Sequence, residues 1–236
     1  MNAQQLKNAI LQEAIEGRLV PQDPNDEPAS ALLDRIRKEK AQLVKAGKLK
    51  KKDLEETPIA EDEKPFEIPE SWEWVRLGDI STYSHTKKKI NAAKASPEIW
   101  SLDLEDIEKG GKLRCIKSVE ERKAIGDKTC FNSGDILYSK LRPYLLKILI
   151  APQDGICTPE IIPFTCYGGL SSKYIVNVLK SPYVDDYINS VTFGVKMPRV
   201  STETMTTLFI PLPPLAEQQR IVAKIEELLG AINALP

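Results

Sequence analysis

Histidine is nearly missing from this chain, because His85 is the only one in 236 residues. Ser-His-Asp triads, histidine proton relays and histidine-rich metal sites would all have to be built around that single side chain. The four cysteines form no C-x-x-C pair, which disfavours a structural zinc or a redox dithiol. The sequence therefore predicts neither a metal site nor histidine-based catalysis.

Long apolar runs are also missing. No stretch approaches the roughly 20 residues that cross a membrane, and the opening MNAQQLKNAILQEAIEGRL has none of the apolar region that an export signal needs. We therefore expect a soluble, cytoplasmic protein with no membrane contact, whose thiols are reduced and mostly buried. A hydrophobic content of 42% is enough for a sizeable core and excludes a wholly disordered chain.

A net excess of either charge is missing as well. Lys and Arg number 33 and Asp and Glu 34, which argues against a uniformly basic nucleic-acid binder. The average hides three unlike parts, however. Residues 35–52 hold nine basic residues and one acid, residues 53–70 hold eight acids and one lysine, and residues 71–199 hold nineteen basic residues and fifteen acids. The third part is therefore mildly basic, with an excess of four positive charges that the neutral average hides.

Helical periodicity marks both ends of the chain. Apolar residues at helical spacing predict a first helix that stops at Gly17, and a second helix from near Pro28 to Gly47. Near the other end, three prolines in four residues prevent a helix before Leu215. From there an apolar seam predicts a coiled-coil-like helix that packs on another helix, at Leu215, Val222, Ile225 and Leu229.

Between the ends, the pattern changes to short β-like runs separated by turn residues. WEWVRL, IWSLDL, KLRCIKSV, DILYSKL, YLLKILIA, GICTPEIIPF and TTLFIPL are such runs. One amphipathic helix is predicted over 171–190. The expected fold class is α+β, with a mixed-sheet domain flanked by helices. We divide the chain into an N-terminal helical region at 1–52, an acidic proline-containing linker at 53–70, the central domain at 71–210 and the start of a C-terminal helix at 211–236.

Four strings then identify a resemblance. LKNAILQEAIEGRLVPQDPNDEPASALLDRIRKEK, PFEIPESWEWVRLGDI, GDILYSKLRPYLLK and IPLPPLAEQQRIVAKIEELL occur in that order. Together they resemble the DNA-specificity subunit of type I restriction-modification systems over almost the whole chain. The resemblance implies a target-recognition domain between helical conserved regions, in a non-catalytic subunit. Family members usually carry two such domains, whereas this sequence has one, so it is either a short form that pairs with a second copy or part of a longer chain.

The resemblance also implies partners. They are double-stranded DNA, the modification (methyltransferase) subunits, the restriction subunit indirectly, and a second copy or half-subunit. No cofactor is expected in this chain, because SAM, ATP and Mg²⁺ would belong to the partner subunits. The function implied is recognition of one DNA half-site and docking of the methyltransferase subunits.

Three segments are candidates for DNA contact. The strand exit at 134–147 carries hydroxyls, cations and an aromatic ring at Ser139, Lys140, Arg142 and Tyr144. These groups suit phosphates, and an arginine can also read guanine. The loop at 192–201 adds Lys196 and Arg199 beside Gly194, and a lysine run adds Lys87, Lys88 and Lys89. For each segment the alternative is structural: Arg142 and Tyr144 would brace the fold, and the lysines would be solvated.

Two other classes of function remain open. Asp103 with Glu121, Arg122 and Lys123 matches the loose D…E-x-K pattern of metal-dependent nucleases, although such a pattern often arises by chance in a chain that is 28% charged. A helical protein-protein adaptor without DNA binding is the other alternative.

Overall fold

The computed structural model describes residues 2–85, 87–192 and 196–234. The helices are α1 (Ala3–Ile15), α2 (Ala29–Lys45), α3 (Leu77–Ile80), α4 (Val119–Arg122), α5 (Ser172–Leu179), α6 (Pro182–Val191), α7 (Thr202–Thr207) and α8 (Leu215–Asn233). The strands are β1 (Glu73–Arg76), β2 (Lys89–Asn91), β3 (Trp100–Leu102), β4 (Asp127–Phe131), β5 (Ile136–Ser139), β6 (Ile148–Ile150), β7 (Gly155–Cys157), β8 (Ile161–Phe164) and β9 (Phe209–Leu212). Single 3₁₀ turns occur at Lys51–Leu54, Glu61–Glu63, Ala92–Lys94, Leu104–Asp106 and Pro143–Leu145. The fold class is α+β, as predicted.

The chain forms two compact units. Unit 1 contains the described residues of 1–81, 166–183 and 206–236, and unit 2 contains those of 82–165 and 184–205. The division predicted from the sequence follows the chain in order, whereas each unit joins segments that are distant in sequence.

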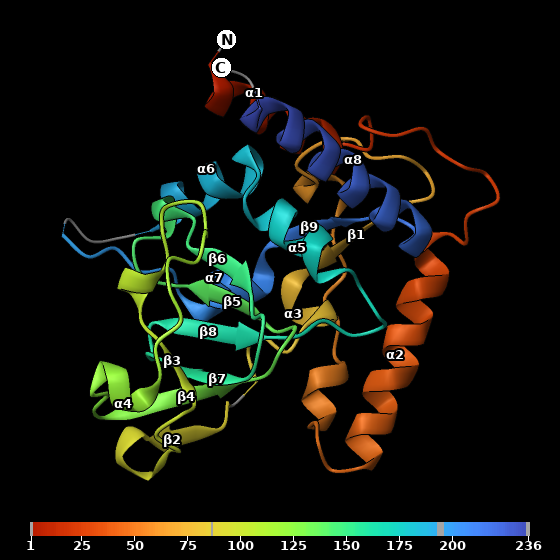
Figure 1. The fold of residues 1–236 in the computed structure, drawn as a ribbon. Coiled ribbons are helices and arrows are strands. Elements are labelled where there is room, and N and C mark those ends of the chain that lie inside the picture. Colours follow the sequence, from red (N-terminus) through yellow and green to blue (C-terminus); the bar gives the residue numbers. More distant parts are fainter. Residues whose placement is uncertain (1, 86, 193–195, 235–236) are drawn as a thin grey trace. The chain divides into compact units, whose positions relative to one another are not determined.

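Helix packing holds unit 1 together. α1 and α8 lie side by side (Figure 1), and α8 also contacts α5. The first helix ends where predicted, since Gly17 adopts a left-handed φ of +72°. A Cβ at Gly17 would also clash with the ring of Pro69. The contacts of α8 with α1 and α5 confirm the expectation that the C-terminal helix packs on another helix.

The second helix and a small sheet complete unit 1. α2 begins after Pro28 and buries Leu32 and Ile36. The acidic segment that follows is anchored by one aromatic side chain, because Phe66 makes edge contacts with the rings of Trp74 and Tyr183 at 4.9 and 5.4 Å. β1 pairs with β9 in an antiparallel two-stranded sheet.

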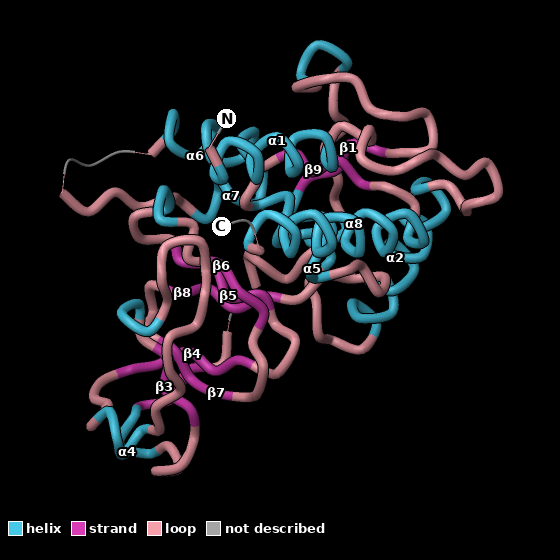
Figure 2. Tube along the Cα trace, turned by 45° about the horizontal axis from the view of Figure 1, so that its top comes forward, coloured by secondary structure: helices cyan, strands magenta, loops and turns pink. Residues whose placement is uncertain are grey.

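Unit 2 contains two sheets, whose strands are drawn in magenta in Figure 2. The larger sheet is mixed, with strand order β2-β4-β7-β3 and β3 parallel to β7. The smaller sheet is antiparallel, with order β6-β5-β8. One apolar core draws side chains from both sheets, among them Trp100, Phe131, Leu137 and Ile161. The predicted mixed sheet is confirmed.

Two predicted elements differ from the structure. The single helix expected over 171–190 is two helices, α5 and α6, because Pro182 lacks the N–H that would continue α5. The run KLRCIKSV forms no strand: it makes only isolated bridges, at Leu113 and Ser118. Within this run, the N–H of Arg114 donates instead to the carbonyl of Asp106 at 2.8 Å.

The cysteines are unpaired thiols, of which Cys157 is buried and the other three are half-buried. Burial raises the pKa of the Cys166 thiol to about 12. No helix among the described residues is long and apolar enough to span a membrane.

Candidate nucleic-acid interface

Two of the segments singled out in the sequence meet in unit 2. Leu141 forms an isolated antiparallel bridge with Arg199. The N–H of Arg142 donates to the carbonyl of Pro198 at 2.8 Å, and the N–H of Val200 donates to the carbonyl of Lys140 at 3.1 Å. The exit of β5 and the end of the 192–201 loop therefore lie side by side.

Arg142 holds an unusual backbone conformation at this junction. Its φ of +49° lies in the left-handed region, which is costly for a residue with a Cβ. Pro143 follows it, and a following proline disfavours the right-handed helical region. The guanidinium of Arg142 also reaches back, with Nη2 donating to the carbonyl of Lys196 at 3.4 Å. Strain of this kind persists where the surroundings fix the residue, and it is concentrated at functional sites.

Most of the side chains around this junction reach solvent. Lys140 is half-buried, and the exposed ones are Arg142, Tyr144, Lys196, Met197 and Arg199. We call these six residues the Arg142 surface. Ser139 does not belong to it, because it is buried and its hydroxyl donates to the carbonyl of Leu141 at 2.9 Å. Gly194, in the same loop as Lys196, lies outside the described residues.

One cation of the Arg142 surface is already paired. Arg199 donates from Nε and Nη2 to the two carboxylate oxygens of Glu160, at 3.1 and 3.0 Å. These hydrogen bonds hold the pKa of Glu160 below its ordinary value, against the opposing effect of burial. The carbonyl of Glu160 accepts from the N–H of Lys140 at 3.0 Å. Glu160 therefore ties both segments together and places a carboxylate beside the cations.

Two further cations near this surface escaped the sequence reasoning. Burial, together with the charges of Arg114 and Arg142, lowers the pKa of Lys147. Lys147 is half-buried, and its ammonium donates to the carbonyl of Leu104 at 2.7 Å. Lys147 lies in the string GDILYSKLRPYLLK, which could have indicated it. Arg114 lies in the run that the sequence predicted to be a strand, so no local signal marked it.

The lysine run divides into two parts. Lys87 is turned inward, and its ammonium donates to the backbone carbonyl of Thr82. Burial lowers the pKa of Lys87 to about 8, and Asp135 opposes this shift. Lys88 and Lys89 are exposed, at the β2 end of the four-stranded sheet rather than at the end of β5.

The carboxylates of the nuclease-like pattern have structural partners. Asp103 pairs with Arg122 at 3.3 Å and with Lys128 at 3.2 Å. Glu121 accepts from the backbone N–H of Ser118 at 2.7 Å, in a capping box at the start of α4. Within residues 2–85, 87–192 and 196–234, no three His, Cys, Asp or Glu side chains are grouped as a metal ion would need.

The predicted seam of the C-terminal helix faces the chain's own core in part. Val222 and Ile225 are buried in unit 1, whereas Leu215 and Leu229 are half-buried. Gln218, the polar position of the seam, is also buried. Its amide oxygen accepts from the N–H of Ser171 at 3.0 Å, and its amide nitrogen donates to the carbonyl of Pro213 at 3.0 Å.

Comparison with known proteins decides the family. Residues 69–235 match the family described as the type I restriction modification DNA specificity domain. The chain belongs to this family. The specificity subunits of the type I restriction enzymes EcoAI and EcoEI from Escherichia coli are 37% and 38% identical to it, each over 98% of this chain. The chain spans about 40% of the length of these two relatives.

Solved structures agree with this assignment. The crystal structure of the HsdS subunit from Thermoanaerobacter tengcongensis matches with a TM-score of 0.62 and 26% identity, over 72% of this chain and 45% of that one. A structure described by complex assembly and conformational transition of the type I R-M system matches equally well. The resemblance identified from the four sequence strings is therefore confirmed, and this specificity domain has the α+β fold of its family.

Proposed function

We propose that this specificity domain reads one half-site of double-stranded DNA through the Arg142 surface, and that it does no chemistry of its own. The observation that carries the proposal is the junction of the two loop segments. It gathers the cations Lys140, Arg142 and Lys196 on one part of unit 2. Phosphates attract such a cluster whatever the DNA sequence, which fixes the register of the protein on the duplex.

The same surface offers groups that distinguish bases. A guanidinium can donate two hydrogen bonds to guanine in the major groove, and an apolar side chain can contact the methyl group of thymine. Arg142 suits the first role, because its backbone is fixed at the junction by the bond to Pro198. Exposed Met197 suits the second. Lys88 and Lys89 are proposed as additional phosphate contacts, whereas Lys87 and Ser139 act inside the fold.

The partners proposed are those of a type I restriction-modification complex in the cytoplasm. Methyltransferase subunits would dock on the helical parts of the chain, and the restriction subunit would join through them. SAM, ATP and Mg²⁺ would be bound by those subunits. The half-buried Leu215 and Leu229 of α8 are the seam positions left for a second copy or half-subunit, because Val222 and Ile225 pack within this chain.

DNA binding can be tested without knowing the target sequence. Mobility shifts with a duplex of about 30 base pairs, at about 50 and about 200 mM salt, measure how strongly the affinity falls with salt, and so how many phosphates the protein contacts. The Lys140→Ala/Lys196→Ala variant should bind more weakly and lose about 1.8 from the slope of log affinity against log salt, at about 0.9 for each contact. Arg142→Ala should weaken binding too, while circular dichroism shows an unchanged fold.

Lys48→Ala is the matched control, because Lys48 is exposed in unit 1 and far along the chain from the junction. It should bind DNA as the parent does. Unchanged affinity of the Lys140→Ala/Lys196→Ala variant would remove the Arg142 surface from the DNA site. If the parent chain shifts no duplex at either salt concentration, the protein-adaptor alternative is favoured. DNA cleavage by the purified chain with Mg²⁺, or methylation with SAM, would contradict the non-catalytic role.

A further inference from the structure

The small sheet of unit 1 has an unpaired edge. In an antiparallel pair, alternate residues direct their main-chain groups to the partner strand. The N–H of Leu77 donates to the carbonyl of Leu208 at 2.9 Å, and β1 pairs with β9 in the same register. Every second residue before Leu77 therefore bonds to β9, and the main-chain groups of Trp74 and Arg76 point the other way. The carbonyl of Arg76 begins α3, because Arg76 is the N-cap of that helix. The N–H and carbonyl of Trp74 and the N–H of Arg76 have no main-chain partner among the described residues.

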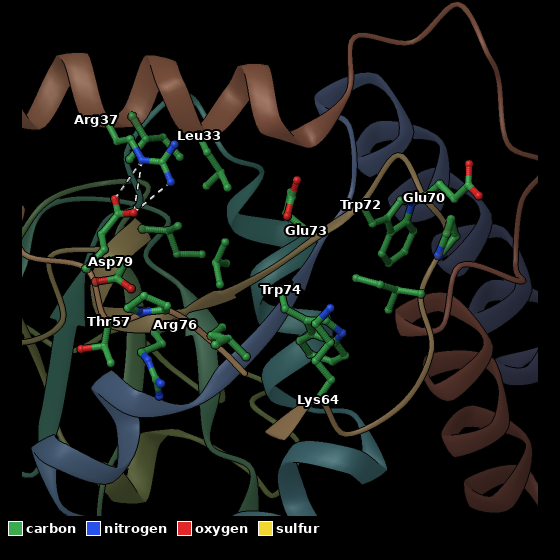
Figure 3. A pocket seen from close by; sticks show the side chains of 18 of the residues that line it. Leu33, Arg37, Thr57, Lys64, Glu70, Trp72, Glu73, Trp74, Arg76 and Asp79 are labelled. Carbon is green, nitrogen blue, oxygen red and sulfur yellow. Dashed lines mark hydrogen bonds and ion pairs between the residues drawn. The ribbon is translucent and has the colours of Figure 1, made fainter. Parts of the chain in front are cut away.

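A cavity of about 580 Å³ lies along this edge (Figure 3). All four residues of β1 line it, from Glu73 to Arg76. Since successive strand residues point to opposite faces, a cavity lined by all four must follow the edge of the strand. The other walls come from α2, through Leu33 and Ile36, and from the acidic segment 56–70. We call this cavity the β1 groove.

Two side chains of the groove carry buried donors without acceptors. The Nε1 of Trp74 and the Nε of Arg76 are both buried, and neither has a hydrogen-bond partner among the described residues. Trp74 as a whole is only 8% exposed. An unsatisfied buried donor costs about 1–3 kcal/mol, so an occupant that brings carbonyl oxygens to this wall would remove a penalty.

The charge of the groove selects the occupant. Glu67, Glu70 and Glu73 line it, and none of them has an ion-pair partner among the described residues. The cations Arg37 and Lys64 of the same wall are each paired with a glutamate, at 2.9 and 2.5 Å. Counting all lining residues, five acids face three cations, because Glu56 and Asp79 add to the acids and Arg76 adds to the cations. This excess of negative charge favours Lys and Arg side chains over phosphates as the groove's occupant.

We propose that the β1 groove binds an extended segment of a partner protein, in which basic and apolar residues alternate, as a third strand on the edge of β1. Main-chain hydrogen bonds to Trp74 and Arg76 would supply affinity, and the flanking walls would select the side chains. Apolar residues of the segment would face Leu33 and Ile36, and basic residues would face the glutamates. The proposal uses only unit 1 and does not depend on the DNA site of unit 2.

Hydrogen exchange on the whole chain tests the strand addition directly. The probe is a synthetic nonapeptide of alternating Lys and Val, and the comparison peptide alternates Glu and Val. With the Lys-Val peptide at saturation, we expect the amides of Trp74 and Arg76 to exchange about tenfold more slowly, because they become hydrogen-bonded. The Glu-Val peptide should leave both amides unchanged. Equal protection by both peptides would contradict the charge argument, and protection by neither would overturn the proposal.

Two variants separate the edge from the charge. Glu70→Lys/Glu73→Lys changes side chains that are not buried, so it should fold normally and bind the Lys-Val peptide about tenfold more weakly. Arg76→Pro removes an edge donor and should abolish protection, provided that circular dichroism shows the native fold. Arg142→Ala, in unit 2, should bind the peptide as the parent does. Undiminished binding by the double-lysine variant would overturn the proposal.

Discussion

The left-handed conformation of Arg142 gives a prediction with a definite sign. Its φ is +49°, in a region that costs a residue with a Cβ about 1–2 kcal/mol. Glycine enters that region freely, but it loses more chain entropy on folding, which costs about 0.5–1 kcal/mol relative to alanine. The balance favours glycine. Arg142→Gly should therefore have a free energy of unfolding about 0.5–1 kcal/mol higher than Arg142→Ala, although both remove the guanidinium and its bond to Lys196.

Urea unfolding followed by circular dichroism measures this difference. With a denaturant slope of about 2–3 kcal/mol/M, the midpoint of Arg142→Gly should lie about 0.3 M above that of Arg142→Ala. DNA binding should be weakened equally in the two variants, because the binding argument rests on the side chain and the stability argument rests on the backbone. A stability order reversed in favour of alanine would refute the assignment of strain to this residue.

Lys123 provides a matched control in the same unit. It ends α4 with a φ of +54° and is exposed. Lys123→Gly should be more stable than Lys123→Ala by a similar amount, while DNA affinity stays unchanged. In both pairs the glycine variant should be more stable than the alanine variant, but only the Arg142 variants should bind DNA more weakly. That result would show that the backbone strain of Arg142 and its side-chain contact with DNA are separate properties.

Two further predictions concern buried groups. Ile225→Glu should destabilise unit 1 by more than about 3 kcal/mol in urea unfolding, since it places a carboxylate where the side chain is 2% exposed; a folded variant that merely changes oligomeric state would contradict this. Asp106→Asn should lower the free energy of unfolding at neutral pH by about 2 kcal/mol, because the buried Arg122 loses a charged partner. The loss stays moderate because Arg122 keeps Asp103 as its other partner. Burial opposes the charge of Asp106, but Arg122 outweighs it and lowers the pKa below its ordinary 3.8. The Asp106 contribution is therefore present at higher pH and lost as pH falls through the lowered pKa, so the deficit of Asp106→Asn should shrink there.

The parts of the fold that follow from local spacing were predictable. The two N-terminal helices depend on apolar periodicity and on stops such as Gly17, and the last helix depends on the proline block before Leu215. These signals lie within one element, so no tertiary information is needed to interpret them. The break between α5 and α6 was missed because the apolar pattern continues across Pro182, while the missing N–H ends the helix.

The candidate site was predictable only in pieces. The segments around Arg142 and Lys196 were each identified from their residue types, but their junction depends on bonds between backbone groups more than fifty residues apart. Composition gives no access to such pairing. For the same reason, the sequence could not distinguish Ser139 and Lys87 from their neighbours, and all of them were predicted to contact DNA. In the structure, the side chains of Ser139 and Lys87 donate hydrogen bonds to backbone carbonyls inside the fold.

The acidic segment shows what a weak pattern leaves unpredicted. Residues 53–70 have little periodicity, which predicts a linker, and this stretch also forms a wall of the β1 groove. It is held by separate contacts, each of which uses one residue: Phe66 packs on Trp74, and Glu56 pairs with Arg37 at 2.9 Å. Periodicity reports only elements that bury a continuous face. A segment attached at isolated points can leave a cavity beside a strand edge, whereas a helix packed on β1 would have filled it. Three of the eight acids that offset the basic residues 35–52 in the sequence average, Glu56, Glu67 and Glu70, line this groove, so the near-neutral total conceals a local excess of negative charge.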